Sequence, residues 1–122
     1  MQNWFITISW PAQGASMNSR KHWSKQRKVK QAIKQEAAIA CRHLPQQLKA
    51  DSVAVAITFY PPDNRRRDAD NLLSSIKPAL DAISERIGID DSKFWPMTLD
   101  KGEKTDDARV EINLTIEKEI KS

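Results

Sequence analysis

The chain has 122 residues and a formal net charge of +4. This length predicts one domain, residues 1–122, around a single modest core. The sequence has no run of about 18 apolar residues, so it predicts no transmembrane helix and no membrane partner. Its first ten residues lack a basic region and a cleavage motif, so no signal peptide is expected. The single cysteine cannot form an internal disulfide, which fits a reducing cytoplasm.

The charges are distributed unevenly along the chain. Residues 1–50 contain nine Lys and Arg and one acid, whereas residues 51–122 contain eleven Lys and Arg and fifteen acids. This asymmetry favours a polyanion-binding face near an acidic site, although a basic chain can also simply be soluble. The chain has only three glycines and no phosphate-cradling glycine loop, so no nucleotide cofactor is expected.

Hydrophobic periodicity predicts strands and helices in the order β-α-β-α-β-β. We expect strands at residues 4–10, 52–60, 94–100 and 109–117, and helices at residues 24–44 and 70–86. This order predicts an α+β domain with a mixed sheet and two main helices.

Local composition adds detail to this outline. Residues 52–60 are dense in Val, Ile, Phe and Tyr, which suits an interior strand. Gly88 is expected to end the second helix, and Pro78 to bend its axis. The polar residues 102–108 are expected to form a hairpin connection between the last two strands.

Carboxylates flank the second predicted helix. Asp68 and Asp70 stand two residues apart, and such positions of an extended chain point the same way, so both carboxylates can face one point. Asp90 and Asp91 can join them if the chain folds back after Gly88. Oxygen ligands without His or Cys select Mg²⁺ or Mn²⁺. The pattern predicts a divalent metal site at these four aspartates.

Each of these aspartates also has an ordinary structural explanation. Asp70 can be the N-cap of the helix, which is a common role for aspartate. Asp90 and Asp91 can belong to a turn after the helix. The neighbouring arginines can form a solvated loop whose charges partly cancel. The residues alone leave both interpretations open.

Two basic stretches accompany the acids. A run without any acid lies between residues 19 and 35 and contains Arg20, Lys21, Lys25, Arg27, Lys28, Lys30 and Lys34. A solvated helix face usually mixes signs to gain ion pairs, so an all-positive run favours a polyanionic partner. The second stretch, Arg65, Arg66 and Arg67, directly precedes Asp68 and suits a phosphate backbone held beside a metal.

Three stretches resemble the RusA family of Holliday junction resolvases: RRRDADNLL, KPALDAI and GIDDSKF. The segment ISWPAQGASMNSRKHW is similar to the family's N-terminal strand and Asn-bearing basic loop. The resemblance covers nearly the whole chain and is weak between residues 24 and 50. The D-x-D-N element is unspecific by itself, but it is specific in combination with the arginines, the distal Asp-Asp and the length.

The resemblance implies a small homodimeric endonuclease that uses Mg²⁺ or Mn²⁺ to cut four-way DNA junctions symmetrically, in recombination and repair. Asp68 and Asp70 match the paired catalytic aspartates. Asp91 matches the third, with Asp90 beside it as a further metal ligand. Branched DNA is the expected partner, contacted by Asn18, Arg20, Lys21, Lys25, Arg27, Lys28, Arg65, Arg66 and Arg67.

The sequence departs from the family pattern in two places. Ala12 follows Pro11 where the family usually has a second proline. Ser74 stands where the family often has a catalytic lysine, about one turn after D-x-D-N, and Lys77 lies a turn later.

We expect Lys77 to be the catalytic cation. On an ideal helix it shares a stripe with Asp70, Ser74 and Asp81. The alternative is a surface lysine paired with Asp81, worth a few tenths of a kcal/mol. Arg67 and Lys93 are the next candidates for this cation.

Two other functions remain open. A non-catalytic DNA-binding protein is disfavoured by the carboxylates, because acids beside phosphate weaken binding unless a cation intervenes. A nuclease of the same chemistry that cuts other branched DNA is not distinguished by the residues.

Overall fold

The computed structural model describes residues 1–11 and 23–116, apart from the side chains of residues 23–25. Its elements are β1 (Gln2–Ser9), α1 (Trp23–Ala40), β2 (Ala54–Tyr60), α2 (Ala69–Ile87), the 3₁₀ helix η1 (Asp91–Lys93), β3 (Met97–Lys101) and β4 (Arg109–Ile116). The predicted α+β class and element order are confirmed. Neither helix in this part of the chain is long and apolar enough to cross a membrane.

The four strands form one mixed sheet in the order β1-β4-β2-β3. β4 pairs antiparallel with both β1 and β2, while β3 pairs parallel with β2. The predicted interior position of β2 is confirmed. The two strands joined through α2 and η1 lie side by side and parallel, which is the usual consequence of a helical crossover.

The predicted hairpin between the last two strands is wrong. β2 lies between β3 and β4, so residues 102–108 must pass the end of β2. The backbone N–H of Gly102 donates to Phe59 (2.8 Å), and that of Thr105 donates to Pro61 (2.9 Å). The reason is that β3 pairs in parallel with β2, to which the α2 crossover connects it, and not with β4.

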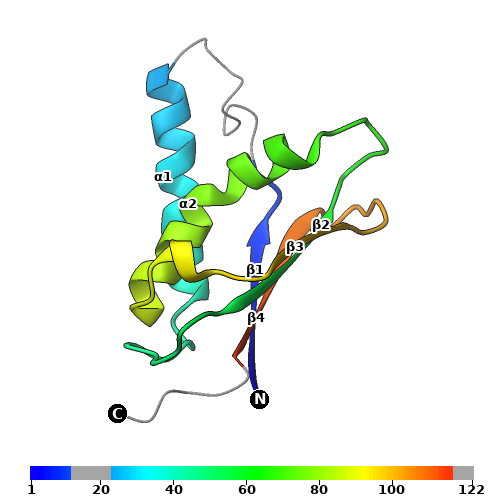
Figure 1. Ribbon diagram of the computed structural model, residues 1–122. Helices are drawn as coiled ribbons and strands as arrows, with labels where there is room; N and C mark the ends of the chain where they lie inside the picture. Colours follow the sequence, from blue (N-terminus) through cyan, green and yellow to red (C-terminus); the bar gives the residue numbers. More distant parts are fainter. Residues whose placement is uncertain (12–22, 117–122) are drawn as a thin grey trace.

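Both helices pack on one face of the sheet (Figure 1). Alternate residues of β2 and β4 are buried beneath them, and the intervening residues lie on the opposite face. The core joins strand residues Ile57, Phe59 and Ile112 to helix residues Ala37 and Ile83, each at most 2% exposed. The apolar stripes predicted for the helices therefore form the second layer of an ordinary two-layer core.

The helix ends are held by specific contacts. Gly88 has φ 74° and caps α2, as predicted, with its N–H donating to Ser84. Arg86 donates to the carbonyls of Leu44 (2.9 Å) and Arg42 (2.8 Å), which joins the end of α2 to the turn after α1. After these contacts, the segment that begins at residue 89 runs back toward the sheet.

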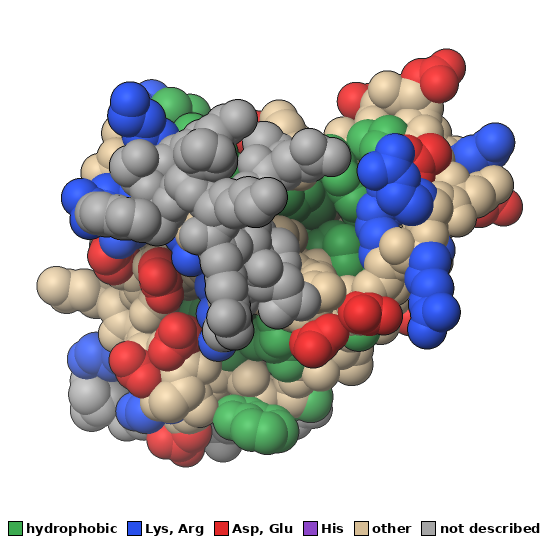
Figure 2. Space-filling model, turned by 90° about the horizontal axis from the view of Figure 1, so that it is seen from above, with side chains coloured by type: hydrophobic (Ala, Val, Ile, Leu, Met, Phe, Trp, Pro, Cys, Tyr) green, Lys and Arg blue, Asp and Glu red, His purple; other side chains and the backbone are tan. Residues whose placement is uncertain are grey.

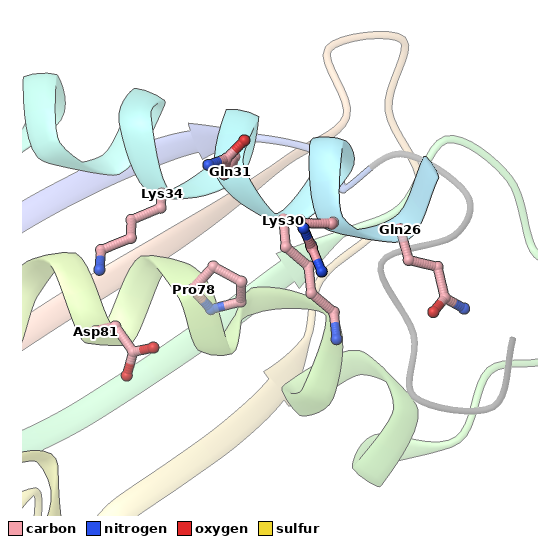
Figure 3. A pocket seen from close by; sticks show the side chains of 7 residues that line it. Gln26, Lys30, Gln31, Lys34, Pro78 and Asp81 are labelled. Carbon is pink, nitrogen blue, oxygen red and sulfur yellow. The ribbon is translucent and has the colours of Figure 1, made fainter. Parts of the chain in front are cut away.

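Helix α2 bends where Pro78 stands in its interior, as predicted (Figure 3). Proline lacks the N–H of a regular helix, and its ring crowds the preceding turn. The bend leaves the first half of α2 and its second half running in different directions. The N-terminal half carries Asp70, Leu73 and Lys77.

Candidate active site

The loop that connects β2 to α2 is organised by its own charges. The Asp63 carboxylate accepts from the backbone N–H of Arg65 (2.9 Å) and from Nη2 of Arg67 (2.8 Å). These two donors, the backbone N–H first, hold the pKa of Asp63 below its usual value. The loop is therefore a constrained turn, and it delivers the chain to Asp68 in a defined direction.

Arg67 is the anchor of this loop. Its Nη1 donates to the carbonyls of Asp63 (3.2 Å) and Arg65 (3.0 Å), and its guanidinium carbon lies 5.1 Å from the centre of the Trp10 ring. Its side chain is only 16% exposed. Of the three arginines, Arg65 and Arg66 are the exposed ones, so they are better placed than Arg67 to meet a phosphate.

Asp68 and Asp70 stand at the first turn of α2, and both are exposed. Asp68 occupies the N-cap position in extended conformation, yet its side chain makes no capping hydrogen bond. Asp70 lies inside the helix, where Oδ1 accepts from the N–H of Asn71 (3.0 Å). The suggested N-cap role of Asp70 is therefore wrong, since Asp68 holds that position. Negative charge in the first turn also stabilises a helix through its dipole.

The chain does fold back after Gly88, as the metal hypothesis requires, and the two aspartates that follow differ in role. Asp90 caps η1, and Oδ2 accepts from the backbone N–H of Ser92 (3.0 Å). The Ser92 hydroxyl and this N–H hold the pKa of Asp90 below its usual value. Asp91 begins η1 and is exposed. Asp90 thus has a structural task, and Asp91 is the better candidate ligand.

Asp91 and Lys77 line a common cavity of about 210 Å³, together with Leu73, Leu80 and Met97. The cavity lies between the exposed side of α2 and the segment that returns after it. Leu73 is one helical turn after Asp70, so the cavity that Asp91 lines begins about one turn from Asp70. The turn at Gly88 brings Asp91 back to α2, as the hypothesis of a chain that folds back there required.

The four predicted metal ligands do not converge on one point. Among residues 1–11 and 23–116, no three Asp, Glu, His or Cys side chains are grouped so that they could hold one ion. The extended geometry assumed for Asp68 and Asp70 ends at Ala69, where the helix begins. The i, i+2 alignment of an extended chain therefore does not reach from Asp68 to Asp70. The predicted four-aspartate cluster is thus not assembled in this structure.

The predicted stripe of Asp70, Ser74, Lys77 and Asp81 is also not a single surface. Ser74 is buried (7% exposed), whereas Lys77 is exposed. Asp81 faces the α1 side of α2, where it lines a different cavity from that of Lys77. The expected alternative, a Lys77–Asp81 ion pair, is absent from the described ion pairs. Lys77 remains available to a substrate, and Ser74 does not.

The basic run on α1 faces α2 across a groove of about 470 Å³ (Figure 3). Its α1 wall contains Arg27, Lys30 and Lys34, and its α2 wall contains Pro78 and Asp81. Lys34 pairs with Glu85 of α2 (2.8 Å), which raises the pKa of the lysine. Part of the positive charge of the basic run on α1 is therefore neutralised within the protein.

Figure 2 looks onto the end of the molecule where both helices begin. Lys and Arg side chains lie there beside acidic side chains, next to an area of hydrophobic side chains. Lys28 of α1 is exposed. Three further predicted DNA contacts, Asn18, Arg20 and Lys21, lie outside the described residues, as does the side chain of Lys25.

Three contributors to this region, Asp63, Trp10 and Trp95, were missed from the sequence. Asp63 and Trp10 hold Arg67, and the spacing of four residues between Asp63 and Arg67 was a usable signal for the first. Trp95 is 69% exposed beside Asp91, and no pattern in the sequence separates it from a core tryptophan.

Known proteins resemble this chain in sequence over nearly its whole length. The sequence model of the family described as "Endodeoxyribonuclease RusA" matches residues 11–115. An uncharacterized protein of Xylella fastidiosa is 32% identical over 117 residues, which cover 90% of this chain and 74% of that protein. Among solved structures, the periplasmic domain of Helicobacter pylori MotB aligns with a TM-score of 0.39 and 12% identity, covering 92% of this chain and 81% of that one. This structural similarity is weak. The family match spans nearly the whole chain, which therefore belongs to the endodeoxyribonuclease RusA family.

Proposed function

We propose that this protein is a divalent-metal-dependent endonuclease that resolves four-way DNA junctions by paired symmetric hydrolysis of phosphodiester bonds. The observation that carries the proposal is the cavity shared by Asp91 and Lys77, next to the helix turn that carries Asp70. An anionic and a cationic side chain beside the same open space suit a metal-assisted reaction on a phosphate. The family match supplies the reaction class.

The donor chemistry of the site fits a hard cation. Asp68, Asp70 and Asp91 are exposed carboxylates, and no His or Cys accompanies them in the described part of the chain. Mg²⁺ is commonly held by one or two carboxylates plus substrate phosphate oxygens and water, so a preformed cage of three is not required. When bound, Mg²⁺ or Mn²⁺ supplies polarisation of a phosphoryl oxygen and neutralises its charge.

The remaining residues have separate tasks in this proposal. The Arg65 and Arg66 guanidinium groups seat the DNA backbone at the mouth of the site, while Arg67 keeps the loop in shape. The Lys77 ammonium neutralises charge that builds up on the phosphoryl oxygens in the transition state. Asp91 holds its position because η1 is capped by Asp90.

A dimer is part of the proposal. A four-way junction presents two equivalent strands, and paired symmetric nicks need two sites related by the same two-fold symmetry. Light scattering at micromolar concentration, with and without junction DNA, tests this. A monomer in both conditions would contradict it.

The central test uses labelled four-way junction and linear duplex of the same sequence, incubated with Mg²⁺, with Mn²⁺ and with chelator. We expect symmetric cleavage of the junction only, and only with metal. Binding without cleavage under every condition would support the non-catalytic alternative. Equal cleavage of flaps, forks and junctions would support a nuclease of broader branched-DNA specificity.

A further inference from the structure

A second cavity adjoins the Lys77 cavity and is mostly apolar. Its volume is about 440 Å³, and its lining consists of Leu73, Asp91, Ser92, Phe94, Trp95, Met97 and Leu99. Leu73, Asp91 and Met97 belong to both cavities. The apolar space is therefore continuous with the place where we expect the scissile phosphate.

Trp95 stands out among the lining residues because it is 69% exposed. Its neighbour Phe94 is almost fully buried (2% exposed), so the two aromatic residues have different roles. A role in the core does not explain Trp95, since most of its surface remains in water. Because Trp95 also lines the cavity, a ligand that enters there can cover the exposed ring.

The segment that carries Trp95 is fixed to the sheet on both sides. The N–H of Val53 donates to Lys93 (3.0 Å), and the N–H of Val55 donates to Pro96 (2.9 Å). The N–H of Trp95 itself donates to Lys93 (3.0 Å). Trp95 is thus displayed from a backbone attached to β2, which suits a platform for a ligand better than a freely moving loop does.

We infer that this cavity receives an unstacked nucleobase that flanks the scissile phosphate, with Trp95 as its stacking platform. The inference rests on the proposed function. Unstacking costs least for a base that is mismatched or already unpaired, and we infer that such a base is supplied at the branch point. An aromatic face accepts any base, while the oxygen of the Ser92 hydroxyl, whose hydrogen bonds Asp90, can accept a hydrogen bond from a base edge.

A second copy of the chain is a poorer occupant. A stable interface buries about 800 Å² on each partner. In the described part of the chain, the other exposed large hydrophobic residues are Met1, Phe5 and Ile39, which lie at the chain start, on β1 and on α1. They do not extend the patch around Trp95. A single exposed aromatic ring beside a charged cavity matches one base better than a protein face.

The test compares Trp95→Ala with Trp95→Phe and with Phe5→Ala, a control that removes an equally exposed aromatic ring (67%) from β1. Junction affinity is measured in chelator, so that no cleavage occurs, and kcat and KM are measured with Mg²⁺. Thermal unfolding verifies that the variants are folded. We expect Trp95→Ala to weaken junction binding about 5- to 150-fold, with Phe recovering most of the loss. Phe5→Ala should bind within twofold of the wild type.

A second set of substrates assigns the loss to one base. Abasic residues are placed singly on either side of the cleaved bond. At the position that the cavity serves, wild type and Trp95→Ala should bind equally, because the partner of the ring is gone. At other positions the full difference should remain.

Three results would overturn the inference. The first is a Trp95→Ala variant that binds every substrate as well as Phe5→Ala does. The second is a binding defect of Trp95→Ala that is the same at every abasic position. The third is a lower oligomeric state of Trp95→Ala in light scattering, which would show that a second copy of the chain covers the ring. Failure of the proposed function is a separate outcome, recognised when the wild type binds junctions but never cuts them. The base-specific binding difference is still measurable in that case.

Discussion

Replacing Lys77 with alanine tests the candidate active site most directly. The lysine is exposed, and it takes part in none of the described ion pairs. Substitution of such a surface residue is expected to change the free energy of unfolding by less than about 0.5 kcal/mol. Any large effect on cleavage must then come from the interaction of its ammonium with the substrate.

The size of that effect follows from where the ammonium can reach. Lys77 lies seven residues after Asp70, about 10 Å along the helix, and helical side chains lean back toward the N-terminus. A charge pair at 4 Å is worth about 1 kcal/mol in water and about 4 kcal/mol at the effective dielectric constant of a protein surface. Because Lys77 and Asp91 are both exposed, we expect an intermediate value, about 2.7 kcal/mol, or about 100-fold in kcat.

The assay is single-turnover cleavage of labelled junction with Mg²⁺, combined with junction affinity in chelator. Lys101→Ala removes an exposed lysine from β3 and is the matched control, expected to cut normally. Ser74→Ala removes a buried hydroxyl and is expected to lower stability rather than the cleavage rate. If Lys77→Ala cuts within threefold of the wild type, the cation comes from elsewhere, and Lys93→Ala is the next variant to assay.

Three further outcomes are expected. Asp70→Asn should abolish cleavage in the labelled-junction assay and keep or improve junction affinity, because it removes a metal-binding charge and a phosphate repulsion at nearly constant shape; wild-type rates would refute the assignment. Junction affinity should fall steeply between low and moderate salt as phosphate contacts release counterions, and a flat titration would exclude residues 20–34 as the footprint. Gly102→Ala should destabilise the fold by about 1–3 kcal/mol in denaturant unfolding, because the new methyl group would stand 2.5 Å from Cδ1 of Tyr60; an unchanged midpoint would show that the ring moves aside freely.

The sequence alone predicted the order of the main helices and strands and the buried face of each. Alternation in β4 and the helical repeat of Ile76, Leu80 and Ile83 are local consequences of one apolar face per element. The helix end at Gly88 and the bend at Pro78 were also predicted correctly, because each depends on the backbone chemistry of that residue and not on distant partners. Asp70, Asp91 and Lys77, the residues of the candidate site, were also predicted from motif and charge.

Of the inferences that depended on strand order, the interior position of β2 is confirmed and the hairpin is not. The supposed hairpin at residues 102–108 failed because β2 is inserted between β3 and β4. The extended geometry from which Asp68 and Asp70 were aligned ends between them, because the helix starts at Ala69. A shift of one residue in a helix start turns a side chain by about 100°, so small errors in bounds become large errors in direction.

Tertiary structure alone decided which charges are free to act. The sequence determined that Arg65, Arg66 and Arg67 precede two aspartates, but only the packing of the loop against Trp10 commits Arg67 to the protein and leaves its neighbours exposed. Likewise Asp91 and Lys77 line one cavity because the chain turns back at Gly88, the cap of α2, on its way to β3. Such pairings depend on the three-dimensional path of the backbone, which joins residues that no local pattern connects.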